Sequence, residues 1–184
     1  MTGQDRERWD ARHAAVSDDR PLPPDELRHR MELLPAGGRA LDVACGRGAV
    51  AVWLALRGFV VDAVDASGVG LAAAAGLAAR HGVAATVRLT AHDLDSGLPD
   101  ACPGPYEVVV CQRFRDPRLY PRLVERLAAG GLLVVTVLSE VGDEPGRWRA
   151  APGELRAAFG GLTVLTVRAE REGSGAAGLL ARRR

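Results

Sequence analysis

Short apolar runs alternate with alanine-rich, helix-like stretches along most of this chain. The pattern predicts five strands, over residues 39–44, 59–64, 84–90, 106–111 and 131–138. It also predicts helices over 48–57 and 68–81, which end at Gly58 and Gly82. After residue 152 we expect a helix over 152–159 and strands over 162–168 and 176–181.

Two of the strand-like runs have apolar residues at successive positions. They cover residues 108–110 and 132–138. Strands of this kind are buried on both faces, which is typical of a parallel sheet covered by helices. Alternating strands and helices therefore predict a doubly wound, mostly parallel α/β sheet with helices on both faces.

Residues 1–36 precede the first strand and are expected to form a helical cover. One helix is predicted over 3–15, followed by a polar connector over 17–21. A second helix is predicted to begin after Pro24 and to end before Pro35. Its apolar stripe would consist of Leu27, Met31 and Leu34.

The length and composition are those of a water-soluble globular protein. The chain has 184 residues, of which 47% are hydrophobic and 26% charged, with a formal net charge of +1. We therefore expect a single domain over residues 1–184, with 37–184 as its α/β core. A net charge this small provides no field that would attract nucleic acid or an acidic membrane.

Targeting and metal-binding signals are not evident in the sequence. The N-terminus is polar, and the apolar runs are too short and too interrupted to span a bilayer. Cys45, Cys102 and Cys111 lack the spacing of metal ligands, so free thiols in a reducing cytoplasm are expected. We predict a cytoplasmic protein without a bound metal.

A glycine turn directly after the first strand is the most informative motif. Gly46 and Gly48 follow the acid Asp42, and a second acid, Asp65, ends the next strand. Because glycines have no side chains, the backbone there can approach a flat ligand closely. This arrangement predicts a site for an adenosine-containing molecule.

Two cofactors fit such a turn. Residues 46–51 match the dinucleotide fingerprint G-x-G-x-x-A, and Asp65 lies near the usual ribose-binding offset, so a nicotinamide cofactor is one alternative. A pyrophosphate would, however, be repelled by an acid at Asp42. Asp42 instead suits a ligand with an ammonium group, such as S-adenosylmethionine (SAM), which we favour.

The chain resembles the class I SAM-dependent methyltransferases over roughly residues 39–140. The resemblance rests on the turn ALDVACGRG, the strand end Val64-Asp65-Ala66-Ser67 and the glycine-rich segment Leu127–Leu133. The N-terminal segment Trp9-Asp-Ala-Arg12-His13 is similar to one in the tellurite-resistance and thiol-methyltransferase-like group. The resemblance implies a Rossmann-like, seven-stranded sheet whose last strand is antiparallel.

The resemblance also implies roles for individual residues. Asp42, Ala44, Cys45, Gly46 and Gly48 would surround the methionine half of SAM. Asp65 would accept hydrogen bonds from the ribose hydroxyls.

The remaining cofactor contacts come from four further segments. Ala66 would pack on the adenine, Asp93 would receive its amino group and Leu94 would supply a backbone contact. A helix cap is the alternative role for Asp93. Cys111 would form part of the pocket wall, and Trp9 and Arg12 would close over the cofactor.

The methyl acceptor is expected near the loop over residues 113–120. Arg113, Arg115 and Arg118 in this loop could orient an anionic substrate or simply face solvent. Glu140 and Trp148 follow the fifth strand and are further candidates for the substrate side. None of these residues can be assigned a catalytic role from the sequence.

The sequence thus predicts direct in-line methyl transfer from SAM to a small molecule, releasing S-adenosylhomocysteine (SAH). The fourth strand exits as Cys-Gln-Arg-Phe114 rather than the N/D-P-P-Y of base-amino methyltransferases, which disfavours a nucleic-acid substrate. Two alternatives stay open: a SAM-binding regulator without turnover, and a nicotinamide-dependent oxidoreductase. The acceptor atom and the oligomeric state are not determined by the sequence.

Overall fold

The chain forms two compact units in the computed structural model. The structure describes all residues except 1–2, 17–19, 142–143, 145 and 169–174. The first unit comprises Met1–Pro23 and Ala36–Pro103, and the second comprises Pro24–Pro35 and Gly104–Arg184. The predicted N-terminal cover is therefore divided between the units, while the assignment of one domain to the whole chain stays a prediction.

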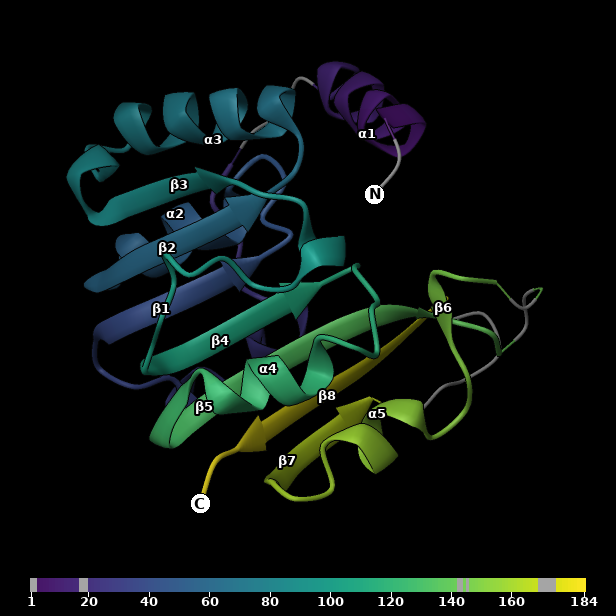
Figure 1. Ribbon diagram of the computed structural model, residues 1–184. Helices are drawn as coiled ribbons and strands as arrows, with labels where there is room; N and C mark the ends of the chain where they lie inside the picture. Colours follow the sequence, from purple (N-terminus) through teal and green to yellow (C-terminus); the bar gives the residue numbers. More distant parts are fainter. Residues whose placement is uncertain (1–2, 17–19, 142–143, 145, 169–174) are drawn as a thin grey trace. The chain divides into compact units, whose positions relative to one another are not determined.

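The first unit contains three parallel strands. They are β1 (Gly38–Val43), β2 (Phe59–Asp65) and β3 (Val87–Ala91), and β2 pairs with both of the others (Figure 1). All three lie within or close to the predicted ranges. The third strand begins three residues later than predicted, because Ala84–Thr86 forms a 3-10 turn (η3).

Helices α2 (Ala49–Ala55) and α3 (Gly68–Arg80) pack against this sheet and against each other. Their contact is apolar: Val52 of α2 and Leu77 and Ala78 of α3 are buried together. Helix α1 (Gly3–Ala14) packs on α3. A short 3-10 turn, η4 (Leu94–Ser96), follows β3. These helices agree with the sequence prediction, whereas the connector predicted over 17–21 falls partly outside the described residues.

The second unit contains the other five strands. They are β4 (Tyr106–Gln112), β5 (Leu127–Ser139), β6 (Arg149–Ala150), β7 (Thr163–Arg168) and β8 (Ala176–Arg182). The order is β4-β5-β8-β7, with the two-residue β6 on the end of β5. Strand β8 is antiparallel to both neighbours, as predicted for the last strand. The structure describes eight strands, so the predicted number of seven is wrong. The additional strand is β6, which at two residues is too short to produce a recognisable apolar pattern.

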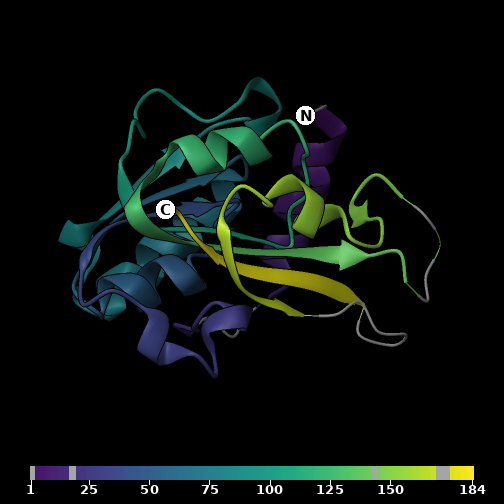
Figure 2. The ribbon, with the colours of Figure 1, turned by 90° about the horizontal axis from the view of Figure 1, so that it is seen from below.

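Both faces of this second sheet are covered. Helices α4 (Tyr120–Glu125) and α5 (Glu154–Ala158) lie on one face, and the 3-10 turns η1 (Asp25–Leu27) and η2 (Met31–Leu33) lie on the other (Figure 2).

The single helix predicted between Pro24 and Pro35 is wrong. Only Leu27 of its expected apolar stripe is fully buried, and Met31 is exposed. A helix this short needs a buried face to be stable, so the segment forms two separate turns instead. Polar contacts hold it: the Asp25 amide donates to Gln112 Oε1 at 2.7 Å, and Glu26 pairs with Arg168.

Among the described residues, no helix is long and apolar enough to cross a membrane.

Candidate functional site

The turn after β1 has the backbone conformation that the sequence predicted. Ala44, Gly46 and Gly48 have φ values of 57°, 53° and 78°, in the left-handed region that favours glycine. A Cβ on Gly48 would lie only 2.6 Å from the Cβ of Ala74 in α3. Gly48 is therefore required both by its φ and by the close packing of α3.

Asp65 fixes this turn from the end of β2. Its Oδ2 accepts a hydrogen bond from the Gly46 amide at 2.7 Å, and its Oδ1 accepts one from the Ser67 amide at 2.8 Å. The two bonds hold the carboxylate rigidly at the carboxyl end of the strand. Each oxygen retains acceptor capacity for a ligand hydroxyl.

Asp62, the other acid on β2, has a structural role. It is buried and forms ion pairs with Arg39 at 3.1 Å and Arg88 at 3.2 Å, which lie on the two neighbouring strands. Asp62 thus joins the three strands through its ion pairs.

Asp42 is buried beneath the turn, with 3% of its surface exposed. Its carboxyl group accepts a hydrogen bond from the Ala51 amide in the first turn of α2, yet its Oδ2 has no hydrogen-bond partner. Burial, together with a smaller effect of the nearby charge of Asp65, outweighs the hydrogen bond from the Ala51 amide and raises the pKa of Asp42 to about 8. Among the described residues, no cation forms an ion pair with Asp42.

The thiol of Cys45 shares this environment. Burial, and then the charges of Asp42 and Asp65, raise its pKa well above the ordinary value. Cys45 is therefore a neutral lining residue rather than a nucleophile.

Helix α1 contacts the glycine turn through His13. A Cβ on Gly46 would lie 3.0 Å from His13 Cε1, and Arg47 Nη1 donates a hydrogen bond to the His13 carbonyl oxygen. The start of α3 is held as well, because the Ser67 hydroxyl donates to Asp10. The sequence prediction did not include this contact between His13 and the turn; the position of His13 in the Trp9–His13 segment was the available signal.

Trp9 and Arg12 contact each other on the same helix. The Arg12 guanidinium lies 5.4 Å from the centroid of the partly buried Trp9 ring, which in turn is 6.2 Å from the His13 ring. Their predicted closure over a cofactor stays a prediction.

Asp93 caps the 3-10 turn η4. Its side chain accepts a hydrogen bond from the Asp95 amide at 3.0 Å, which is the cap role considered above. Leu94 is buried, and Ala66 is partly buried directly after Asp65. The His92 amide donates to the Asp65 carbonyl oxygen and so holds this segment to the end of β2. Contacts of Ala66, Asp93 and Leu94 with an adenine stay predictions.

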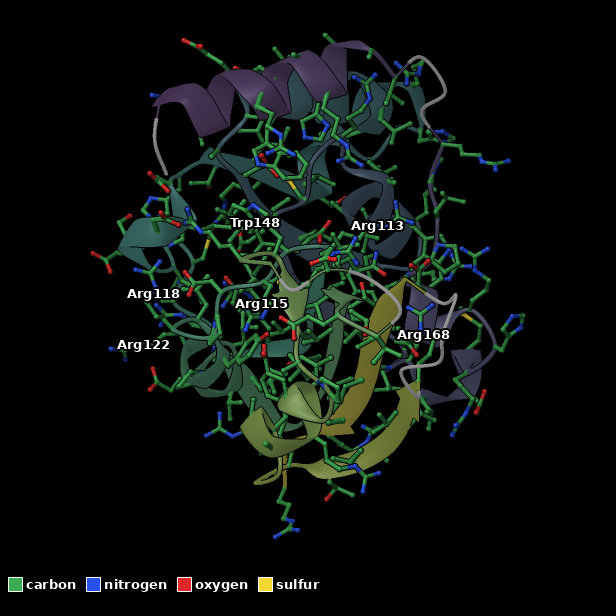
Figure 3. The ribbon with its side chains drawn as sticks, turned by 90° about the vertical axis from the view of Figure 1, so that its right-hand side faces the viewer. Arg113, Arg115, Arg118, Arg122, Trp148 and Arg168 are labelled. Atoms are coloured by element: carbon green, nitrogen blue, oxygen red, sulfur yellow. The ribbon has the colours of Figure 1, made fainter. Side chains whose placement is uncertain are left out.

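The remaining candidate residues lie in the second unit. Cys111 is buried in β4, and its thiol lies 3.7 Å from the Phe114 carbonyl oxygen. Arg113 follows β4 with a φ of 56°, and with Ala44 it is one of two non-glycine residues of the described chain with positive φ. Its side chain is 77% exposed, with Nη2 3.9 Å from Asp25 Oδ2. Arg113 is thus a strained and accessible cation (Figure 3).

Arg115 and Arg118 are engaged within the loop. Arg115 makes a two-point contact with Glu154, with Nε–Oε1 2.8 Å and Nη2–Oε2 2.6 Å. The Tyr120 hydroxyl donates to the same carboxylate at 2.9 Å. Arg118 pairs with Asp116 at 2.6 Å. These two arginines therefore hold the loop over 113–120 in shape, whereas Arg113 makes a longer ion pair, 3.9 Å to Asp25, and is the loop's candidate for binding an anion.

Trp148 and Glu140 follow β5. The Trp148 ring lies 6.2 Å from that of Phe114, and the Arg147 guanidinium lies 4.5 Å from its centroid. The Glu140 amide donates to the Ala150 carbonyl oxygen at 3.1 Å. In Figure 3, Trp148, Arg113 and Arg115 are seen at the carboxyl ends of β4 and β5.

Over the part of the chain that the structure describes, no group of three or more His, Cys, Asp or Glu side chains could hold a metal ion. That the protein works without a metal stays a prediction.

Comparison with known proteins identifies the family. Residues 40–131, half of the chain, match the family described as "Methyltransferase domain". The chain belongs to this family. The expected class I SAM-dependent methyltransferase family is thereby confirmed.

Curated relatives of this methyltransferase-domain chain differ in their named substrates. It is 38% identical over 109 residues to a ubiquinone biosynthesis O-methyltransferase of Caulobacter sp. (strain K31), covering 56% of this chain and 42% of that protein. It is 34% identical over 157 residues to the ribosomal RNA small subunit methyltransferase C of Chromohalobacter salexigens, covering 77% of this chain and 43% of that protein. The chain spans less than half the length of both relatives.

Solved structures show the same fold. TehB from Haemophilus influenzae is similar with a TM-score of 0.67 and 18% identity, covering 79% of this chain and 57% of that one. Magnesium protoporphyrin IX methyltransferase (ChlM) from Synechocystis PCC 6803, solved with bound SAM, is similar with a TM-score of 0.64 and 18% identity, covering 98% of this chain and 80% of that one. The predicted Rossmann-like methyltransferase fold is confirmed.

Proposed function

We propose that this chain is a SAM-dependent methyltransferase whose cofactor site is formed by residues 44–48 together with Asp42 and Asp65. The observation that carries the proposal is the pairing of a rigid ribose-type acid with a second, buried acid beneath one glycine turn. SAM combines a ribose with a charged ammonium group. An orphaned carboxyl oxygen on Asp42 is a fitting partner for that ammonium.

The electrostatics of the turn argue against a nicotinamide dinucleotide. A pyrophosphate bound there would add negative charge beside Asp42 and Asp65. Burial and, to a smaller extent, the charge of Asp65 raise the pKa of Asp42, so this environment already disfavours a negative charge on its carboxyl group. A cationic ligand relieves the conflict, whereas a pyrophosphate increases it.

When bound, SAM supplies an activated methyl group on its sulfonium. The residues of this chain would then act by binding and orienting. Asp65 holds the ribose from the end of β2, and Asp42 holds the ammonium end. Positioning an acceptor in line at roughly 3–3.5 Å can supply several kcal/mol of rate enhancement without a dedicated base.

We infer a small-molecule acceptor rather than RNA. RNA binding requires several accessible cations that can neutralise phosphates. In the loop after β4 and in α4, Arg115, Arg118 and Arg122 are instead paired with Glu154, Asp116 and Glu125. Arg113 is the most exposed of these arginines, at 77%, and its ion pair with Asp25 is the longest, at 3.9 Å, which suits it to bind a single anionic group on a small acceptor. The relative named for ubiquinone biosynthesis is consistent with such an acceptor, while the relative named for ribosomal RNA makes RNA the alternative to test.

The experiment has two stages. Calorimetric titration with SAM and NAD first determines which cofactor binds. SAH formation is then followed with phenols, carboxylic acids, thiols, amines and small-subunit ribosomal RNA as acceptors. The proposal expects SAM to bind and SAH to accumulate with a small acceptor.

Three results would count against parts of the proposed function. Preferential NAD binding would overturn the cofactor assignment. SAH formed with RNA alone would overturn the acceptor class. Tight SAM binding without SAH formation from any acceptor would favour a SAM-binding regulator.

A further inference from the structure

The carboxyl group of Asp42 is in an environment that does not support its negative charge. It is buried, its Oδ2 has no hydrogen-bond partner, and it forms no ion pair with any residue that the structure describes. Burying an ionised carboxylate without a partner is very unfavourable, and such a group stays neutral by keeping its proton.

Of the groups that face Asp42, the acid Asp65 reinforces this neutral state and the Ala51 amide opposes it. The end of β2 contributes the acid Asp65, and the turn contributes the Cys45 thiol, which stays neutral. Helix α2 contributes the Ala51 amide, whose hydrogen bond favours the charged carboxylate but is outweighed by burial.

The charged groups on neighbouring elements are directed elsewhere. Asp62 of β2 is paired with Arg39 and Arg88, and the Arg47 guanidinium donates to the His13 carbonyl oxygen of α1. The His13 ring lies against Gly46.

We propose that Asp42 holds a proton in the free protein and releases it to solvent when the ammonium group of the cofactor binds beside it. The inference rests on the proposed cofactor site and adds a linked proton to it. The O–H bond of the carboxyl group breaks, the electron pair stays on Asp42 and the proton passes to the buffer. The resulting carboxylate and the ammonium then form the ion pair that the free protein lacks.

The sign of the linkage follows from this exchange. Because binding requires the deprotonated form, affinity weakens as the pH falls below about 8, the pKa of Asp42 in the free protein. The expected change is about tenfold per pH unit in that range. Above pH 8 this contribution levels off, and at pH 7 nearly one proton should leave for each ligand bound.

Calorimetry measures this proton directly. SAH is titrated into the protein at pH 7 in phosphate, HEPES and Tris, whose ionisation enthalpies differ, and the slope of the observed enthalpy against these values gives the number of protons released. The wild-type slope should exceed that of Asp42→Asn by nearly one proton. Protonation of the ligand itself cancels in this difference.

A second ligand provides a control that needs no mutation. 5′-Methylthioadenosine retains the nucleoside but lacks the ammonium group, so its binding should release no proton from Asp42. Equal proton release by wild type and Asp42→Asn with SAH, or equal release by the two ligands in wild type, would overturn the inference. If neither SAH nor SAM binds the wild type at all, the proposed cofactor site itself is wrong.

Discussion

Gly48 shows how a single residue shapes the cofactor turn. Its φ of 78° is unfavourable for residues with a Cβ, and any Cβ would lie 2.6 Å from that of Ala74. The spacing of the two glycines in the sequence indicated the first restriction, the left-handed backbone of the turn. The contact with α3 depends on tertiary packing and could not be predicted from the turn alone.

We expect Gly48→Ala to lower the free energy of unfolding by about 2–4 kcal/mol, as the sum of left-handed strain and overpacking. Gly58→Ala is the matched control, because Gly58 also has a left-handed φ, of 86°, but no atom lies within 4 Å of the position that its Cβ would take. Gly58→Ala should lower the free energy of unfolding by only about 1–2 kcal/mol. Urea unfolding measures the loss in both variants. If Ala74→Gly fails to restore part of the loss in Gly48→Ala, the packing explanation is incorrect.

Asp65 combines a structural and a binding role. Asp65→Ala should weaken SAM binding by roughly 1–3 kcal/mol, because it removes the ribose acceptor and the bonds to Gly46 and Ser67. Asp62→Asn is the control: it removes the charge of a buried acid from its ion pairs with Arg39 and Arg88, and should lower stability while leaving SAM affinity nearly unchanged. Calorimetric titration of folded samples separates an effect on SAM binding from an effect on stability. Equal affinities of wild type and Asp65→Ala would reject the ribose assignment.

At the scale of elements, the loop after β4 depends on its contact with α5. Arg115 and Tyr120 both bond to Glu154, which joins the loop, α4 and α5. Sequence reasoning placed Arg115 near a substrate because its partner lies 39 positions away and could not be recognised from local spacing. The same limit applies to Arg39 and Arg88, whose shared acid lies on another strand.

The Glu154 contact makes a pH-dependent contribution to stability. Burial alone would raise the pKa of Glu154, but hydrogen bonds from Arg115 and Tyr120 lower it overall. Its stabilising effect is therefore present above the unfolded value near 4.5 and lost as the pH falls below it. The difference in unfolding free energy between wild type and Glu154→Gln should shrink from pH 6 to pH 3.

Glu125→Gln is the control for this series. Glu125 forms a more exposed pair with Arg122, and exposed pairs of this kind contribute little. Its substitution should change stability by less than about 0.5 kcal/mol across the same pH range. A pH-independent effect of Glu154→Gln would show that the charge of Glu154 is not what stabilises the loop.

The strands and longer helices were predictable because their apolar periodicity is strong. The strands over 59–65 and 106–112 and helix α3 differ from the prediction by one residue. Elements that depend on tertiary contacts were not predictable: β6 has two residues, η1 is held by Gln112 and Arg168, and the Leu33 carbonyl oxygen of η2 accepts from Arg182. The local pattern of apolar and polar residues does not reveal contacts with distant strands.

At the scale of the whole molecule, a buried proton on Asp42 should influence global stability. The folded protein keeps this proton up to about pH 8, whereas the unfolded chain loses it near 3.8. Between these values the unfolded state binds fewer protons, so stability falls as the pH rises, by up to ~1.4 kcal/mol per pH unit from this group. Urea unfolding from pH 5 to pH 8 should show a shallower decline for Asp42→Asn. Parallel curves would mean that Asp42 is ionised in the folded protein.

The central claim is that the turn over residues 44–48 binds the nucleoside and amino-acid parts of SAM. A crystal structure with SAH at saturating concentration tests this claim most directly. The account predicts ribose hydroxyls bonded to Asp65 and the ligand ammonium beside Asp42. Density for SAH at another place, or an empty turn in crystals grown with excess ligand, would contradict it.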